Sequence, residues 1–199
     1  MADIAVKLVA EYLQACGYFV QTEVPVWVQQ RGQEVDVTDL DIIAVRLPGH
    51  APPAADDGLL AAEDDLIDII IGEVKQGKAR LNAGLFQTRA IEHALRVVGC
   101  CPEPELPEAA RKIASGMRLR MDHAEYACRV RCVAFAGRGY VGRTSVLTVR
   151  LGDCAMALDA AVRSDGFAGA APDSIAGLLQ LLAKGDPDVK LQRGETGGT

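Results

Sequence analysis

The feature that most constrains this chain is a nearly continuous apolar run, LIDIII, which leads into the tetrapeptide Gly72-Glu73-Val74-Lys75. Such a run predicts a strand that is buried on both faces, in the middle of a sheet. Because side chains alternate along a strand, Glu73 and Lys75 lie on the same face. A carboxylate and an ammonium group at the end of so apolar a strand must face a cleft or be paired.

A second acidic residue enters a second apolar strand upstream, where Asp41 lies within TDLDIIAV. If the two strands are neighbours in the sheet, Asp41 and Glu73 converge on one divalent cation. Mg²⁺ suits this set because it is held by one or two carboxylates, and the main-chain carbonyl of Val74 offers a further oxygen. Mn²⁺ is the alternative ion. Asp39 and Asp36 in the same stretch remain alternatives to Asp41 as the ligand.

Hydrophobic periodicity gives the order of the elements, since a 3.6-residue period predicts helices and β-branched, aromatic runs predict strands. The expected helices are 3–16, 82–98, a short one through 109–117, 153–163 and 173–184, and the expected strands are 18–28, 35–47, 66–76, 126–137 and 145–152. Pro25 in the first expected strand predicts an edge position or a bulge. This order describes an α/β sandwich around a mixed sheet.

The length of 199 residues suits one domain with a small appendage. We expect a core over residues 1–151, a C-terminal helical appendage over 152–184 and a flexible tail over 185–199. The acidic, proline-rich segment 48–65 is expected to be a solvated loop between two strands.

Charge is distributed unevenly along the chain, although the net charge is −6 and the pI is about 5.1. Residues 34–68 hold ten acidic side chains and one basic, whereas residues 73–131 hold eleven basic and seven acidic. The overall acidity argues against a coat protein for nucleic acid, and the second segment leaves room for a basic groove. The N-terminus lacks the pattern of a secretory signal, and no apolar run approaches the roughly 20 residues of a membrane span. We therefore expect a cytoplasmic protein without a membrane partner.

The cysteines are expected to be reduced, buried and apolar in character. They are Cys16, Cys100, Cys101, Cys128, Cys132 and Cys154. A metal site or an iron–sulfur cluster held by cysteines is the alternative, but no CxxC pair occurs and the spacing matches no standard pattern. Arg129 and Arg131 are expected on the solvent face of a half-exposed strand, with a DNA groove as the alternative.

Over residues 3–136 the chain resembles the PD-(D/E)XK superfamily of nucleases, which includes type II restriction enzymes and Holliday-junction resolvases. LVAEYLQACGYFVQTEVPV resembles the family's first helix and first strand, DLDIIAV its Asp-bearing second strand, and IIIGEVKQ its (D/E)xK third strand. QTRAIEHALRVVG resembles the helix that follows. The resemblance implies a restriction-endonuclease-like αβββαβ core and metal-dependent hydrolysis of phosphodiester bonds in DNA.

The resemblance also implies roles for individual residues. Asp41 and Glu73 would hold the metal ion, and Lys75 would be the catalytic lysine that assists the attacking water. Further roles are implied for Glu11 as an accessory acid, for Gln87 as a support of the metal-bound water or a phosphate, and for Lys78, Arg80 and Arg89 as phosphate contacts.

Such enzymes often act as homodimers, and the segment 152–184 is the expected interface. The alternative function is a catalytically inactive module with the same fold that serves in binding or protein interaction, which the acidic composition favours.

Overall fold

The computed structural model describes ten segments of the chain. They are residues 3–30, 33–49, 58–61, 63, 65–78, 87–116, 118–123, 126–138, 146–164 and 174–185.

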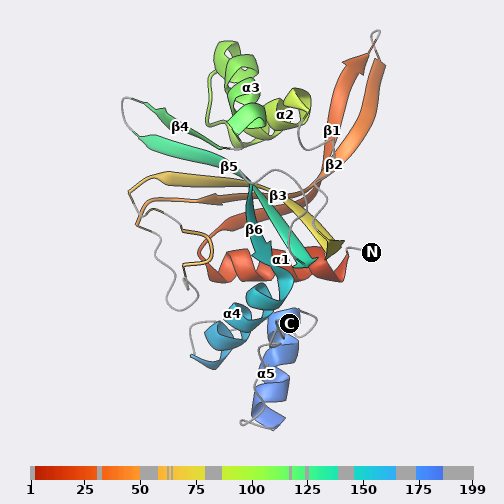
Figure 1. The fold of residues 1–199 in the computed structure, drawn as a ribbon, viewed down its shortest axis with the longest axis vertical. Coiled ribbons are helices and arrows are strands. Elements are labelled where there is room, and N and C mark those ends of the chain that lie inside the picture. The colour runs from red at the N-terminus through yellow and green to blue at the C-terminus, as the bar shows by residue number, and fades with distance from the viewer. Residues whose placement is uncertain are drawn as a thin grey trace, which may run out of the picture.

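A mixed sheet of six strands forms the centre of the molecule (Figure 1). The strands are β1 (Phe19–Gln30), β2 (Gln33–Arg46), β3 (Ile67–Lys78), β4 (Arg118–Asp122), β5 (Ala127–Arg138) and β6 (Leu147–Arg150). Their order is β1-β2-β3-β5-β4, with β6 also paired to β5. The β1–β2, β2–β3 and β4–β5 pairs are antiparallel, and the β3–β5 and β5–β6 pairs are parallel. The predicted α/β class with a mixed sheet is confirmed, as is the edge position of β1.

Helices cover both faces of the sheet (Figure 1). They are α1 (Ile4–Ala15), α2 (Thr88–Val98), the short 3₁₀ helix η1 (Glu103–Glu105), α3 (Leu106–Gly116), α4 (Leu151–Arg163) and α5 (Ile175–Gly185). In Figure 1, α2 and α3 lie above the sheet and α1, α4 and α5 lie below it. The side chain of Asp3 caps α1 by accepting a hydrogen bond of 2.9 Å from the Ala5 N–H.

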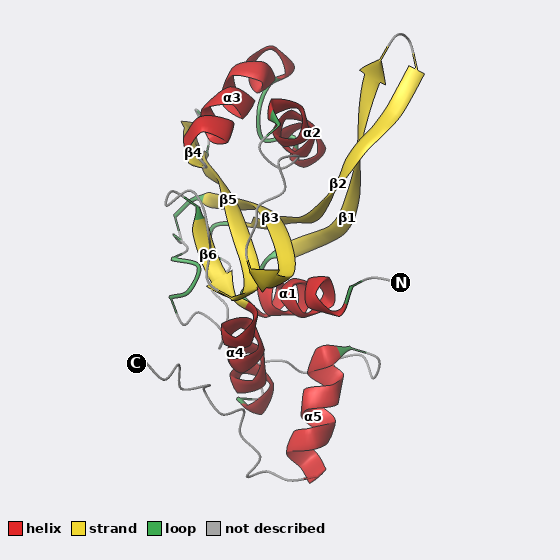
Figure 2. Ribbon diagram, turned by 45° about the vertical axis from the view of Figure 1, so that its right-hand side comes forward, coloured by secondary structure: helices red, strands yellow, loops and turns green. Residues whose placement is uncertain are grey.

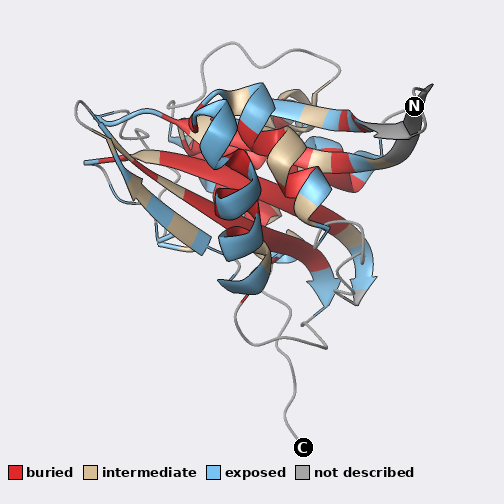
Figure 3. Cartoon of the chain, turned by 90° about the horizontal axis from the view of Figure 1, so that it is seen from above, coloured by how far each residue is buried: buried red, intermediate tan, exposed pale blue. Residues whose placement is uncertain are grey.

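Alternation along β3 gives each face its own core, and β3 is a central strand as predicted. Ile69 and Ile71 pack with α2 and α3, whereas Ile70 and Val74 pack with α1 and α4. Figure 3 shows the central strands as a continuous buried band. Glu73 and Lys75 are each an even number of residues from Ile69 along the strand, so their side chains lie on the same face as Ile69, the face that α2 and α3 cover.

Two features differ from the expected elements. The strand β4, with the sequence RLRMD, was not expected, because its alternation of charged and apolar residues is too short for a periodicity argument. The helix α2 begins at Thr88, and the earlier part of the expected helix 82–98 lies outside the described residues. Apart from residue 185, the expected tail also lies outside them.

In the segment 152–184, α4 packs onto the sheet, since Cys154, Leu158 and Val162 belong to the same core as α1 and the sheet residues Val133 and Phe135. Whether it is a separate appendage stays a prediction. No helix among the described residues is long and apolar enough to cross a membrane.

Candidate active site

The candidate site lies where β2 separates from β3. The ladder between these strands runs from Arg46 opposite Asp68 to Ile42 opposite Gly72. One step further, Asp41 and Glu73 would face each other. Instead, the Asp41 Oδ2 accepts a hydrogen bond of 2.7 Å from the main-chain N–H of Val74. The carboxylate thus takes the place of the strand neighbour at the point where the two strands part.

A local bend in the β1–β2 hairpin produces this separation. Glu23 in β1 has a φ of 52°, a left-handed conformation that is uncommon for a residue other than glycine. Leu40 and Ile42, two residues apart on β2, pack into opposite cores, so the alternation reverses at Asp41. On the neighbouring strand Val24 shares the core of Leu40. Figure 2 shows the hairpin curving away from the rest of the sheet.

Lys75 connects the two carboxylates. Its Nζ lies 2.5 Å from the Glu73 Oε1 and 3.8 Å from the Asp41 Oδ2. Glu73 is buried, with 4% of its side chain exposed, whereas the Lys75 and Asp41 side chains are 38% and 25% exposed. The three groups together carry a net negative charge at a place that solvent reaches. We define Asp41, Glu73 and Lys75 as the carboxylate–lysine site.

The sequence therefore identified three residues that the fold brings together. It left Asp39 and Asp36 as alternatives to Asp41. Asp39 is exposed, and the Asp36 side chain lies outside the described residues. It is Asp41 that contacts the Val74 N–H and lies near Lys75.

The other predicted residues lie elsewhere or outside the described part of the chain. Gln87 is exposed at the start of α2 without a side-chain capping bond, and Arg89 is exposed on the same helix, which covers the face that bears Glu73. Lys78 is the last residue of β3, but its side chain lies outside the described residues, as does all of Arg80. Their predicted contacts with phosphate stay predictions.

Glu11 has a different partner from the one that the resemblance implies. Its two carboxylate oxygens accept hydrogen bonds of 2.9 Å from the Ile175 N–H and 2.7 Å from the Ala176 N–H. These are main-chain donors at the N-terminus of α5, where a carboxylate is favoured by the helix dipole. The geometry gives Glu11 a helix-capping contact, and its accessory catalytic role stays a prediction.

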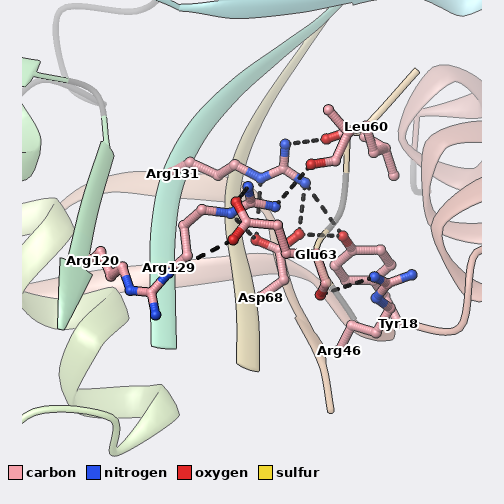
Figure 4. A network of polar contacts seen from close by, with 9 residues as sticks. Tyr18, Arg46, Leu60, Glu63, Asp68, Arg120, Arg129 and Arg131 are labelled. Carbon is pink, nitrogen blue, oxygen red and sulfur yellow. Dashed lines mark hydrogen bonds and ion pairs between the residues drawn. The ribbon is translucent and has the colours of Figure 1, made fainter. Parts of the chain in front are cut away.

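A second polar cluster lies near the start of β3 (Figure 4). Asp68 is fully buried and accepts hydrogen bonds from the Tyr18 hydroxyl at 2.5 Å, from Arg129 Nε at 3.1 Å and from Arg131 Nη2 at 2.6 Å. Arg131 also donates to the Leu60 carbonyl. We call this group the Asp68 network.

The expectation for the two arginines was wrong. Arg131 is buried and only 15% of the Arg129 side chain is exposed, because both are drawn inward by Asp68. A signal was present in the sequence, since an aspartate between two isoleucines in a buried strand needs cationic or donor partners.

The Asp68 network shifts two pKa values. Burial opposes ionisation of Asp68, but the hydrogen bonds from Arg129, Tyr18 and Arg131 and the charge of Arg131 hold the pKa of the carboxyl below its usual 3.8. Burial, followed by the neighbouring Asp68 carboxylate, raises the pKa of the Tyr18 hydroxyl above its usual 10. The tyrosine therefore keeps its proton and donates it in the hydrogen bond.

All six cysteines are buried and free, as expected. Within the described segments no three His, Cys, Asp or Glu side chains gather closely enough to hold a metal ion by themselves. Comparison with protein-family models, with curated proteins and with solved structures found no match for this chain.

Proposed function

We propose that this chain is a divalent-metal-dependent endonuclease of the PD-(D/E)XK type that hydrolyses phosphodiester bonds in DNA. The observation that carries the proposal is the convergence of Asp41, Glu73 and Lys75 at the fork between β2 and β3. A buried glutamate and a partly exposed aspartate beside one lysine leave a negative group open to solvent, which is what a cation and then a phosphate require.

The donor set fits Mg²⁺ or Mn²⁺. Asp41 and Glu73 supply hard carboxylate oxygens, and a hydrated Mg²⁺ needs no more than one or two of these from the protein. The Val74 carbonyl is a further oxygen on the same side, because the N–H and the C=O of one strand residue point the same way and the N–H points at Asp41. This donor set relies on a main-chain oxygen and on water, so it needs no third acidic side chain.

Each side chain has a distinct task in this proposal. A bound divalent cation polarises the phosphoryl oxygen and lowers the pKa of a coordinated water. Lys75 donates hydrogen bonds to the attacking water or to a phosphate oxygen and neutralises charge that develops there. Glu73, buried and adjacent, orients the lysine ammonium group. The hydrogen bond from Val74 to Asp41 fixes the aspartate rotamer.

The substrate contacts and the assembly follow from the same proposal. Gln87 and Arg89 lie on the helix over this face of the sheet, and with Lys78 and Arg80 they are the proposed contacts to water and phosphate. A homodimer in the cytoplasm, associated through residues 152–184, would place one site on each DNA strand.

The test is metal-dependent cleavage of a labelled panel of linear duplex, supercoiled plasmid, single strand, flap and four-way junction. Lys75→Ala and Glu73→Gln are expected to reduce the rate at least about a hundredfold, as loss of a general acid–base or electrostatic group does. Lys112→Ala is the matched control, because Lys112 also pairs with a carboxylate, at 2.7 Å from Glu108, but on the exposed surface of α3. The control should cleave at the wild-type rate.

Two outcomes would overturn the proposal. One is cleavage that persists in Glu73→Gln, which would identify a contaminating enzyme. The other is a folded wild type that neither cleaves any substrate nor binds Mn²⁺ through Asp41 and Glu73 in calorimetry. That result would favour the alternative, a restriction-endonuclease-like binding module without turnover.

A further inference from the structure

Four arginines lie close together on β4 and β5 in an unfavourable arrangement. In the antiparallel register, Arg118 is directly opposite Arg131, and Arg120 is directly opposite Arg129. Like charges opposite each other destabilise an antiparallel pair unless something neutralises them. The partners of these four residues therefore show how the charge is balanced and where it is not.

The two arginines of β5 are fixed in place. Arg131 bonds to Asp68 through both Nε and Nη2, and Arg129 bonds to Asp68 through Nε and to the Ala61 carbonyl through Nη2 (Figure 4). Arg129 also pairs with Glu63 at 2.5 Å. A guanidinium group held this way is already ordered, so it would lose little further conformational freedom on binding a ligand.

The two arginines of β4 are much less constrained. Arg120 is 54% exposed, with its Nε 3.1 Å from Asp122 and its Nη1 3.8 Å from Glu63. Arg118 is exposed and makes no side-chain hydrogen bond or ion pair within the described part of the chain. Donors are therefore available at Arg118 and Arg120, next to arginines already held in place.

A cavity of about 550 Å³ lies between these side chains. It forms because β4 and β6 share one edge of β5, where β4 pairs as far as Arg131 and β6 pairs from Val133 onward, so that Cys132 has neither as a neighbour. All four arginines line it, and among the described residues that line it Glu63 is the one acidic side chain. Leu66 and Leu147 supply an apolar wall, whereas the Leu119 side chain packs against the core on the other face of the sheet.

We propose that this cavity binds the phosphate group of a nucleotide, with the apolar wall receiving the nucleoside. The forked donors of arginine match phosphate oxygens two at a time, and the volume falls in the range of about 300–1,000 Å³ that is usual for small-molecule sites. The site is separate from the carboxylate–lysine site, because Arg129 is opposite Asp68 near the start of β3, whereas Glu73 is opposite Ala134, beyond the point where β2 has left β3. The proposal does not depend on the proposed nuclease activity.

Glu63 distinguishes this proposal from a purely structural role of the arginines. Its side chain is 46% exposed, pairs with Arg129 and approaches Arg120, so it competes with a bound phosphate for the same donors. The Glu63 main-chain carbonyl separately accepts a hydrogen bond of 3.2 Å from Arg46, which a side-chain substitution leaves in place. Glu63→Gln is therefore expected to tighten phosphate binding, whereas damage to the fold would weaken it.

The experiment is isothermal titration of the full chain with thymidine monophosphate, compared with thymidine and with inorganic phosphate. Arg118→Ala is expected to weaken binding of the monophosphate about tenfold or more, as loss of a charge-assisted pair does, and Glu63→Gln to strengthen it severalfold. Arg111→Ala on α3, whose exposed guanidinium bonds to the Pro107 carbonyl, is the matched control and should bind as the wild type does.

Four results would overturn the proposal. They are no binding of the monophosphate at millimolar concentration by the folded wild type, unchanged binding in Arg118→Ala, equal binding of thymidine, and weaker binding in Glu63→Gln. Lys75→Ala reports on the other site, so loss of binding in that variant would move the nucleotide to the carboxylate–lysine site and refute the assignment to the cavity.

Discussion

Replacing Asp68 with asparagine removes one negative charge from the centre of the Asp68 network with little change of shape. In the wild type the carboxylate accepts hydrogen bonds from Tyr18, from Arg129 Nε and from Arg131 Nε and Nη2. Asparagine keeps one acceptor oxygen, and its amide group turns hydrogen-bond donors toward arginines that are also donors. Part of the network is lost, and Arg131 remains buried without its counter-charge.

The expected magnitude follows from the burial. Asp68 has no exposed surface and Arg131 is 7% exposed, so neither charge recovers its solvation by a small shift. Removing one partner of a buried ion pair costs about 3–5 kcal/mol. A domain has a free energy of unfolding of about 5–15 kcal/mol, so Asp68→Asn should remove about a fifth of it or more.

Urea denaturation followed by circular dichroism at pH 7 measures this loss. Asp122→Asn is the matched control, since Asp122 also pairs with an arginine, Arg120, at 3.1 Å, but is 70% exposed. Exposed pairs contribute little, so the control should unfold close to the wild type. If Asp68→Asn loses no more stability than Asp122→Asn, the reasoning from burial is refuted.

The difference in unfolding free energy between the wild type and Asp68→Asn should depend on pH, with a definite sign. The pKa of Asp68 is lowered in the folded state, so its contribution is complete above the usual value of 3.8 and is lost as the pH falls through the lower folded value. The gap between wild type and Asp68→Asn should therefore stay constant from pH 7 to about 5 and narrow below that. A gap that grows on acidification would contradict a lowered pKa.

Three further substitutions test separate parts of the fold by urea denaturation. Gly72→Ala should lower the free energy of unfolding by about 1–3 kcal/mol through overpacking, because the new Cβ would lie 2.9 Å from the Ile42 Cβ. A urea midpoint equal to that of the wild type would contradict this expectation. Glu11→Gln should cost about 1 kcal/mol and speed amide hydrogen exchange in the first turn of α5, and unchanged exchange would exclude the capping role. Tyr18→Phe should lower the free energy of unfolding by about 1.5–3 kcal/mol at pH 7. The difference in this free energy between the variant and the wild type should narrow above pH 10, the usual tyrosine pKa, because the pKa of Tyr18 is raised in the folded state. A difference that widens above pH 10 would refute the raised pKa.

Much of the fold could be predicted because the signals were local and repeated. The run before Gly72 is apolar on both faces of the strand, and a solvent-exposed position would leave many of these side chains in water. A central position in the sheet therefore follows from composition alone. Pro25 cannot donate to a ladder, and the strand that contains it is at the edge. By contrast, the short strand β4 owes its existence to β5, against which all its residues pair. A contact between distant segments leaves no periodic trace in a stretch that short.

The candidate site could be predicted in its chemistry but not in its register. Regular alternation would place Leu40 and Ile42 on one face and leave the choice among Asp36, Asp39 and Asp41 open. The bend at Glu23 reverses the alternation and brings Asp41 to the Val74 N–H. A left-handed glutamate in a strand is a property of the folded hairpin, and nothing in the residues QTEVP demands it. The register that pairs Ile42 with Gly72 therefore puts Asp41 beside Lys75.

The strand β3 carries a structural acid near its start and a chemically available one in its middle. Asp68 and Glu73 lie on one strand and are both buried, at 0% and 4% exposure. At Asp68 the partners are arginines and a tyrosine that are themselves largely enclosed, so the charge is balanced internally and solvent ligands are excluded. At Glu73 the ion pair is with Lys75, which is 38% exposed and lies where β2 has already turned away. A lysine ammonium on a flexible stem can move aside for a cation at low cost, whereas the enclosed arginines cannot. Burial alone would rank the two acids as equal; the exposure of Lys75, compared with that of the arginines, favours Glu73 over Asp68 as the proposed metal ligand.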